Sequence, residues 1–159
     1  MGAAAAVAGQ NLGAGHPERS VRAVRVAAGI GLGGAAVIGV LFLTIPGLLL
    51  GIFGMDDPDV LRIGTELMRY LALSGLFITV ALTYTGGLQG TGDTKGPLYI
   101  SIVSQIVVPL GICAVLQATT GLEPADIWVA ILLGHATRCG LSVARFRQEK
   151  WRRIAVEIA

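Results

Sequence analysis

The chain has 159 residues, of which 53% are hydrophobic and only 14% are charged, and its mean hydropathy is +0.72. Soluble domains carry about 25% charged residues, so this composition excludes an ordinary soluble protein and favours a membrane protein. The net charge is +2, and the two cysteines predict no disulfide or metal framework.

Charged residues are absent from four long segments, at 26–55, 70–92, 96–122 and 127–137. Three of these reach the roughly 20 apolar residues that a membrane-spanning helix needs, and the fourth does so when it is continued to Arg145. The sequence therefore predicts an all-α membrane protein with a short N-terminal stub. Its four transmembrane helices are expected at about 24–53, 60–90, 97–117 and 125–147.

The charged residues between these helices predict their orientation. If the helices alternate in direction, one side of the membrane holds Arg19, Arg22, Arg25, Lys95 and the five basic residues of 145–153. The other side holds six acidic residues and only two arginines. The positive-inside rule then places both termini in the cytoplasm. Trp128 and Trp151, about 34 Å apart by helix rise, are expected to anchor the last helix at the two membrane interfaces.

The stretch "GGLQGTGDTKGP" at 86–97 resembles a phosphate-binding loop but fails its requirements. A dinucleotide fingerprint follows a strand and reads G-x-G-x-x-G, and a P-loop places Lys directly after its last Gly. Neither condition holds here, and Asp93 would repel a phosphate. The stretch is expected to be a turn between two membrane helices, with Asp93 accepting backbone N–H bonds and Pro97 in the next helix's first turn.

A second stretch, "GQNLGAG" at 9–15, shares the pattern G-x-x-x-G-x-G with "GGLQGTG" at 86–92. Both close an apolar segment on the same side of the membrane. This predicts two helix ends that pack backbone to backbone, as small residues at such spacing allow. The structural motif then comprises Gly9, Gln10, Gly13, Gly90, Gly92, Asp93, Thr94 and Pro97.

Four stretches in one order resemble the multidrug and toxic compound extrusion (MATE) transporters: "VAGQNLGAGHPERS", "YLALSGLF", "GGLQGTGDTKGPLYISIVSQ" and "RFRQEKW". The most specific part is "GLQGTGDTKGPLYI" at 87–100. The resemblance implies twelve helices in two six-helix lobes. This chain would be a C-terminal fragment of the second lobe, holding the end of helix eight and helices nine to twelve.

The resemblance also implies an activity and partners. The whole transporter would export xenobiotics or organic cations by H⁺ or Na⁺ antiport in the cell (inner) membrane, and this part is expected to be inactive alone. Expected partners are the missing N-terminal lobe, the small-molecule substrate, the coupling ion and the lipid bilayer, with no nucleic acid and no cofactor. Some sodium-coupled members carry an acid in the helix that matches 70–92. This segment has none, so the coupling carboxylate would lie in the missing helices.

Uncharged polar residues are the candidates for a substrate cleft: Thr79, Thr83, Ser101 and Gln105. The two threonines share a stripe with Gly86 and Gly90, and their hydroxyls either bond the carbonyl four residues earlier or face the cleft. Gln105 either bonds another helix or lines the cleft, since an amide at this depth needs a partner. Pro109 removes a helix hydrogen bond and allows a bend nearby.

His135, Arg138 and Ser142 share one face of the last helix. Arg138 lies about 10 Å inside Arg145 by helix rise, so it is expected to snorkel as an interface anchor. A histidine without a carboxylate partner is expected to be a packing residue. No nucleophile–base pair or metal-ligand pattern occurs, which disfavours an enzyme.

Two other interpretations stay open from the sequence. One is a small four-helix membrane protein that acts as an interaction or assembly subunit. The other is a relative of the lipid-linked sugar flippases, which fits the "GDTKGP" turn less well.

Overall fold

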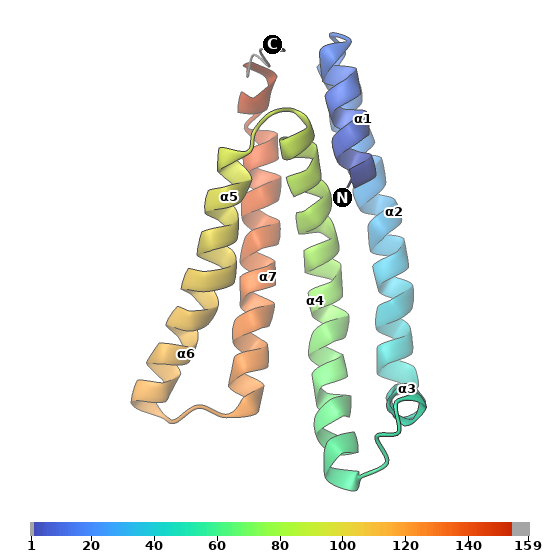
Figure 1. The fold of residues 1–159 in the computed structure, drawn as a ribbon, viewed down its shortest axis with the longest axis vertical. Coiled ribbons are helices and arrows are strands. Elements are labelled where there is room, and N and C mark those ends of the chain that lie inside the picture. Colours follow the sequence, from blue (N-terminus) through green and yellow to red (C-terminus); the bar gives the residue numbers. More distant parts are fainter. Residues whose placement is uncertain (1, 154–159) are drawn as a thin grey trace.

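Residues 2–153 are described by a computed structural model, and every regular element among them is helical (Figure 1). In chain order these are α1 (Gly2–Gly13), α2 (Pro17–Thr44), α3 (Pro46–Ile52), α4 (Pro58–Gly90), α5 (Lys95–Ile102), a π-helical segment (Val103–Val107), α6 (Val108–Thr119), α7 (Pro124–Arg147) and a 3₁₀ turn (Lys150–Arg153). The predicted stub is the helix α1.

Four helical stretches in this range are long and apolar enough to cross a membrane, as predicted: Pro17–Thr44, Pro58–Gly90, Lys95–Thr119 and Pro124–Arg147. Their bounds agree with the prediction to within two residues, except for the first. That helix starts at Pro17 rather than near 24 and ends at Thr44 rather than 53. Pro46 explains the early end, because its ring removes an N–H and forces Ile45 out of the helical region, at φ −130° and ψ 43°. The apolar segment then restarts as α3.

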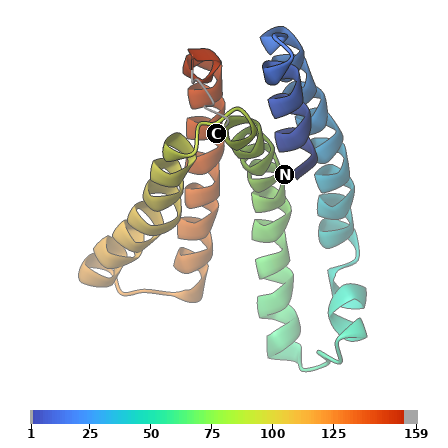
Figure 2. The same ribbon diagram turned by 45° about the horizontal axis from the view of Figure 1, so that its top comes forward.

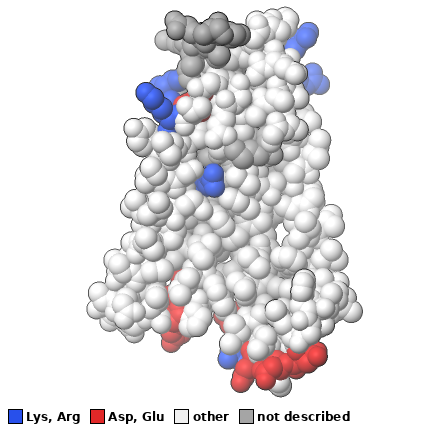
Figure 3. Space-filling model, viewed as in Figure 1, with Lys and Arg blue, Asp and Glu red and all other residues white. Residues whose placement is uncertain are grey.

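The helices alternate in direction, and α4 lies between α2 and α7 (Figure 1). The α5–α6 helix packs against α7, and Figure 2 shows the same neighbours after rotation. The short helix α1 contacts both α2 and α4 at one end of the bundle. Lys and Arg side chains gather mainly at that end and Asp and Glu side chains at the opposite end (Figure 3).

The buried core of the bundle lies at the α1 end and is formed by Ala8, Val24, Leu88, Phe146 and Trp151. The Trp151 ring is fully buried, stacks on Phe146 at 5.1 Å between ring centroids, and donates its Nε1–H to the Phe146 carbonyl oxygen at 2.9 Å. The prediction that Trp151 anchors the membrane interface is therefore wrong. Glu149, at φ +55°, turns the chain back after α7 and places Trp151 over the helix end.

The third spanning helix is not regular, because Val103–Val107 form a π-helical segment between α5 and α6. Within it, the Val108 N–H donates to the carbonyl of Val103, five residues earlier. Pro109 follows immediately and has no N–H with which to continue either hydrogen-bonding pattern. The expected irregularity near Pro109 is thus an inserted residue in the helix, which changes the residues that face α7.

Candidate functional site

A cleft of about 480 Å³ lies between α2 and α4 and reaches α7. Its wall is almost entirely apolar, with the polar side chains Ser74, Thr79 and His135. The remaining lining residues are Gly31, Gly34, Ala35, Ile38, Gly39, Phe42, Leu71, Ala72, Gly75 and Ile78. Such a concave, apolar surface with a few polar groups is the usual form of a small-molecule site.

Small residues on the two helices create this cleft. At Gly39 a Cβ would lie 3.6 Å from the Ala72 carbonyl oxygen, and at Gly31 a Cβ would lie 2.7 Å from the Thr79 methyl group. The α2 backbone therefore contacts α4 at Gly39, and the Thr79 methyl group occupies the space beside Gly31. Gly34, by contrast, lines the cleft and has open space where a side chain would be.

The structure separates the two threonine candidates. The Thr79 hydroxyl donates to the Gly75 carbonyl oxygen at 2.7 Å, and the Thr83 hydroxyl donates to the Thr79 carbonyl oxygen at 2.8 Å. Both hydroxyls thus bond back along α4, the first of the two interpretations offered by the sequence. Thr79 lines the cleft, whereas Thr83 is buried outside its lining.

The other two candidates lie elsewhere. Ser101 lines a separate hollow at the α4–α5 turn, together with Gln89, Thr94, Lys95, Pro97 and Leu98. Gln105 is exposed on the π-helical segment, while its neighbour Ser104 is buried and donates to the Ile100 carbonyl oxygen at 2.6 Å. The structure therefore does not bring Thr79, Thr83, Ser101 and Gln105 together.

The repeated glycine pattern places α1 against α4. A Cβ on Gly9 would lie 2.5 Å from the Gly90 carbonyl oxygen, and a Cβ on Gly90 would clash with the Ala5 carbonyl. The first glycine of one copy thus meets the second glycine of the other, with backbone against backbone. Gln10 is exposed and Gly13 has open space around it, so these two motif residues take no part in the contact.

The α4–α5 turn is held by Asp93, whose side chain is only 4% exposed. One carboxylate oxygen accepts the Gly96 N–H at 2.9 Å, and the other accepts the Arg145 Nε–H at 2.7 Å. Gly92 has φ +90°, a conformation that favours glycine, while Pro97 is fully buried and Thr94 is exposed. The Asp93 carboxylate thus accepts a backbone N–H of the turn, as predicted, and also pairs with Arg145.

Sequence reasoning missed the partner of Asp93. Arg145 comes from the far end of α7, 52 residues later, and only the packing of α7 beside the turn brings the two together. The available signal was the position of both residues on the same predicted side of the membrane.

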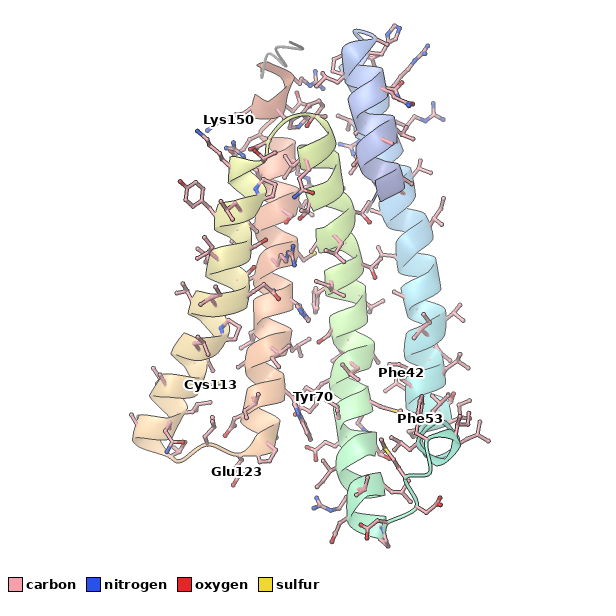
Figure 4. All side chains as sticks on the ribbon, viewed as in Figure 1. Phe42, Phe53, Tyr70, Cys113, Glu123 and Lys150 are labelled. Atoms are coloured by element: carbon pink, nitrogen blue, oxygen red, sulfur yellow. The ribbon has the colours of Figure 1, made fainter. Side chains whose placement is uncertain are left out.

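The face of α7 that meets α4 carries polar side chains along its length. The Tyr70 ring points from α4 toward α7 (Figure 4) and lies 5.7 Å from the Trp128 ring between centroids. Further along, the Thr85 and Ser142 hydroxyls are 3.3 Å apart. Between these contacts, Nδ1 of His135 and Nε of Arg138 are buried without a hydrogen-bond partner in the described part of the chain. Arg138 as a whole is half-buried although its Nε is buried, so its role as a snorkelling anchor stays a prediction.

Comparison with known proteins identifies relatives over most of this chain. The sequence model of the MatE family matches residues 1–115. A probable multidrug resistance protein NorM from Deinococcus radiodurans is 33% identical over 145 residues, which cover 87% of this chain and 32% of the relative. A protein of the same name from Brucella suis is 32% identical over 144 residues, covering 88% of this chain and 31% of the relative.

A more distant relative is the multidrug resistance protein MdtK from Edwardsiella ictaluri. It is 24% identical over 152 residues, covering 92% of this chain and 33% of the relative. The chain thus spans about a third of the length of the curated relatives it matches.

Proposed function

This chain belongs to the MatE family and is a multi-pass membrane protein, and we propose that it forms the C-terminal part of a multidrug efflux transporter. In this proposal α1 is the end of helix eight, and the four spanning helices are helices nine to twelve of a twelve-helix, two-lobe protein. The proposal is supported by the number of spanning helices and by relatives about three times as long as this chain.

We place the protein in the cell (inner) membrane with both termini of the chain in the cytoplasm. The arginines of α2, Lys95 and the basic residues after Arg145 lie at the α1 end of the bundle. The acidic residues of the α3–α4 and α6–α7 connections lie at the other end. Basic residues are retained on the cytoplasmic side during insertion, which supports this orientation.

We further propose that the transporter exports lipophilic xenobiotics or organic cations by H⁺ or Na⁺ antiport. The observation that carries it is the cleft between α2 and α4, whose apolar wall suits a lipophilic solute. The four charge-free segments of this chain hold no Asp or Glu, so the carboxylate that binds the coupling ion belongs to the rest of the transporter.

Export by this part alone is not expected. Alternating access in transporters of this kind is a movement of one helix bundle against another around a site near the middle of the membrane. The four helices described here supply less than one bundle of six. The rest of the transporter, which includes the N-terminal lobe, is therefore the partner that completes the cleft.

Efflux of ethidium from cells tests this proposal. One strain would express residues 1–159 alone, and a second would co-express them with the N-terminal two thirds of the Deinococcus radiodurans relative. We expect gradient-dependent efflux only in the second strain. Efflux from the first strain would indicate a small transporter that works as a homo-oligomer. Failure of the second, with both pieces present in the membrane, would contradict the assignment to an efflux transporter.

A further inference from the structure

The α4–α7 interface leaves two buried nitrogens without partners between its two closed ends. His135 and Arg138 are three residues apart and therefore share one face of α7. Trp128 lies about two to three turns before them against Tyr70, and Ser142 lies about one to two turns after them against Thr85. We propose that His135, which lines the α2–α4 cleft, and Arg138, about one turn further along α7, form a site that recognises a carboxylate.

The depth of Arg138 means that its charge needs a counter-ion. Helix rise puts it about 10 Å from Arg145 and about 21 Å from Pro124 along α7. Both distances place it within a hydrocarbon layer that is about 30 Å thick. Arginine at such a depth faces the protein interior and pairs with an acid or with backbone carbonyls, because an unpaired charge is costly there.

The described part of this chain does not supply that acid. Asp93 is held by Arg145, Glu149 by Arg152, and Glu18 lies 3.4 Å from His16. The other described acids lie toward the opposite end of the bundle, before or within the first three turns of α4 and before or within the first turn of α7. No carboxylate in residues 2–153 is within hydrogen-bond distance of the buried nitrogen of either residue.

A carboxylate fits these two residues in charge and in hydrogen bonding. Arg138 brings one positive charge and N–H donors, which a single carboxylate balances and accepts from. A phosphate dianion would leave a net negative charge against an apolar wall. The neutral imidazole of His135 adds one donor, and this residue lines the cleft, so a group that enters the cleft reaches His135 first.

The carboxylate has two potential sources. It belongs either to the transported solute or to an Asp or Glu of another segment of the transporter. Both sources rest on the proposed function, because both assume that the cleft is part of a larger transporter. The chemistry of recognition is the same in each case, and the experiments below separate them.

The first experiment measures binding to the purified chain in nanodiscs, where the rest of the transporter is absent. The probes are 1-pyrenebutyrate and the neutral 1-pyrenebutanol, followed by fluorescence anisotropy with empty nanodiscs subtracted. We expect the wild type to bind the carboxylate about tenfold more tightly than the alcohol, which corresponds to one charge-assisted contact. Arg138→Gln should remove this preference, and His135→Ala should reduce it.

Arg147→Gln is the matched control, because it removes the same charge from an exposed position on the same helix. It should keep the preference for the carboxylate. Arg138→Lys keeps the charge and should retain part of the preference, which guards against misfolding of Arg138→Gln. The proposal is overturned if Arg138→Gln binds like the wild type, or if Arg147→Gln loses the preference equally.

The second experiment identifies the source of the carboxylate in cells that co-express the N-terminal two thirds of the transporter. Rhodamine 110 carries a carboxylate, and rhodamine 123 is its methyl ester. If the solute provides the carboxylate, Arg138→Gln should lower export of rhodamine 110 much more than export of rhodamine 123. If another segment provides it, both should fall equally. Unchanged export of both would overturn the site in the assembled transporter.

The two experiments also distinguish failure of the proposed export function from failure of the carboxylate site. A wild type that exports neither dye would reject export, while the binding experiment on the purified chain would still decide whether the carboxylate site exists.

Discussion

Gly90 lies where α1 and α4 pack backbone against backbone. The carbonyl of Ala5 on α1 occupies the place where a side chain of Gly90 would be, and Gly9 meets the Gly90 carbonyl in turn. Backbone contact of this kind is a common way for membrane helices to associate, because van der Waals packing replaces the hydrophobic effect inside lipid. Removing the space at Gly90 should therefore separate α1 from α4.

We expect Gly90→Ala to lower the stability of the folded protein by about 1–3 kcal/mol, and Gly90→Leu to lower it further, because α1 must move away. Gly75→Ala is the control on the same helix, since nothing lies within 4 Å of its Cβ position. Thermal midpoints of the purified variants in detergent provide the comparison. Equal midpoints for Gly90→Ala and Gly75→Ala would refute the contact.

The ion pair between Asp93 and Arg145 fastens the α4–α5 turn to α7. Asp93→Asn keeps an oxygen for the Gly96 N–H but removes the charge that Arg145 faces. We expect a loss of about 1.5–3 kcal/mol, typical of a hydrogen bond to a charged group. Arg145→Gln should cost about as much, and the double variant little more than either single one.

The exposed pair of Arg152 and Glu149 is the control for this prediction. Its side chains are 36% and 46% exposed, so Glu149→Gln should cost only about 0.2–1 kcal/mol. If Asp93→Asn and Glu149→Gln shift the denaturation midpoint equally, the turn is not fastened by its ion pair.

The α5–α6 helix depends on one glycine of α7 for its packing. A Cβ on Gly134 would lie 2.5 Å from the Ser104 carbonyl oxygen and 3.0 Å from the Pro109 ring. The π-helical segment and Pro109 thus present a carbonyl that approaches the α7 backbone directly. The π-helical segment of α5–α6 therefore packs against α7 only because residue 134 has no side chain.

Gly134→Ala should therefore destabilise the protein by about 1–3 kcal/mol, because neither the carbonyl nor the proline ring moves freely. Gly140→Ala, on the same helix and with open space at its Cβ position, should be nearly neutral. Hydrogen exchange of the α5–α6 amides checks this directly. Faster exchange in Gly140→Ala than in Gly134→Ala would contradict the packing described here.

The spanning helices were predictable because charged residues bound them, but some of their ends were not. Pro46 ends the first spanning helix but adds no charge to the apolar segment. The absence of charged residues alone therefore predicted a helix that continued past Pro46. Trp151 was placed at an interface on its spacing from Trp128. The turn at Glu149 instead folds it onto Phe146, and helix periodicity carries no information on such a turn.

The residues of the cleft were predicted less well than the helices, because the cleft depends on how the helices pack in the whole bundle. Polar residues were grouped by helix face, but which face meets which neighbour depends on packing between helices far apart in sequence. Thr79 faces α2 because Gly31 leaves room for it, and the inserted residue after Ile102 leaves Gln105 exposed. The π-helical segment and the α4–α7 register had no sequence signal beyond Pro109.

The arrangement that we propose for the whole molecule is four alternating helices that cross the membrane with their basic ends in the cytoplasm. Cysteine labelling in intact cells tests it most directly, with single cysteines at Thr94 and Asp56 in a background that lacks Cys113 and Cys139. Both positions are exposed, and Asp56 is preferred to Asp57 because Asp57 caps α4 through the N–H groups of Asp59 and Val60. We predict that an impermeant maleimide labels Asp56→Cys from outside and labels Thr94→Cys only after the cells are opened. Labelling of Thr94→Cys from outside, or of both positions from the same side, would contradict the arrangement of four alternating membrane helices with cytoplasmic basic ends.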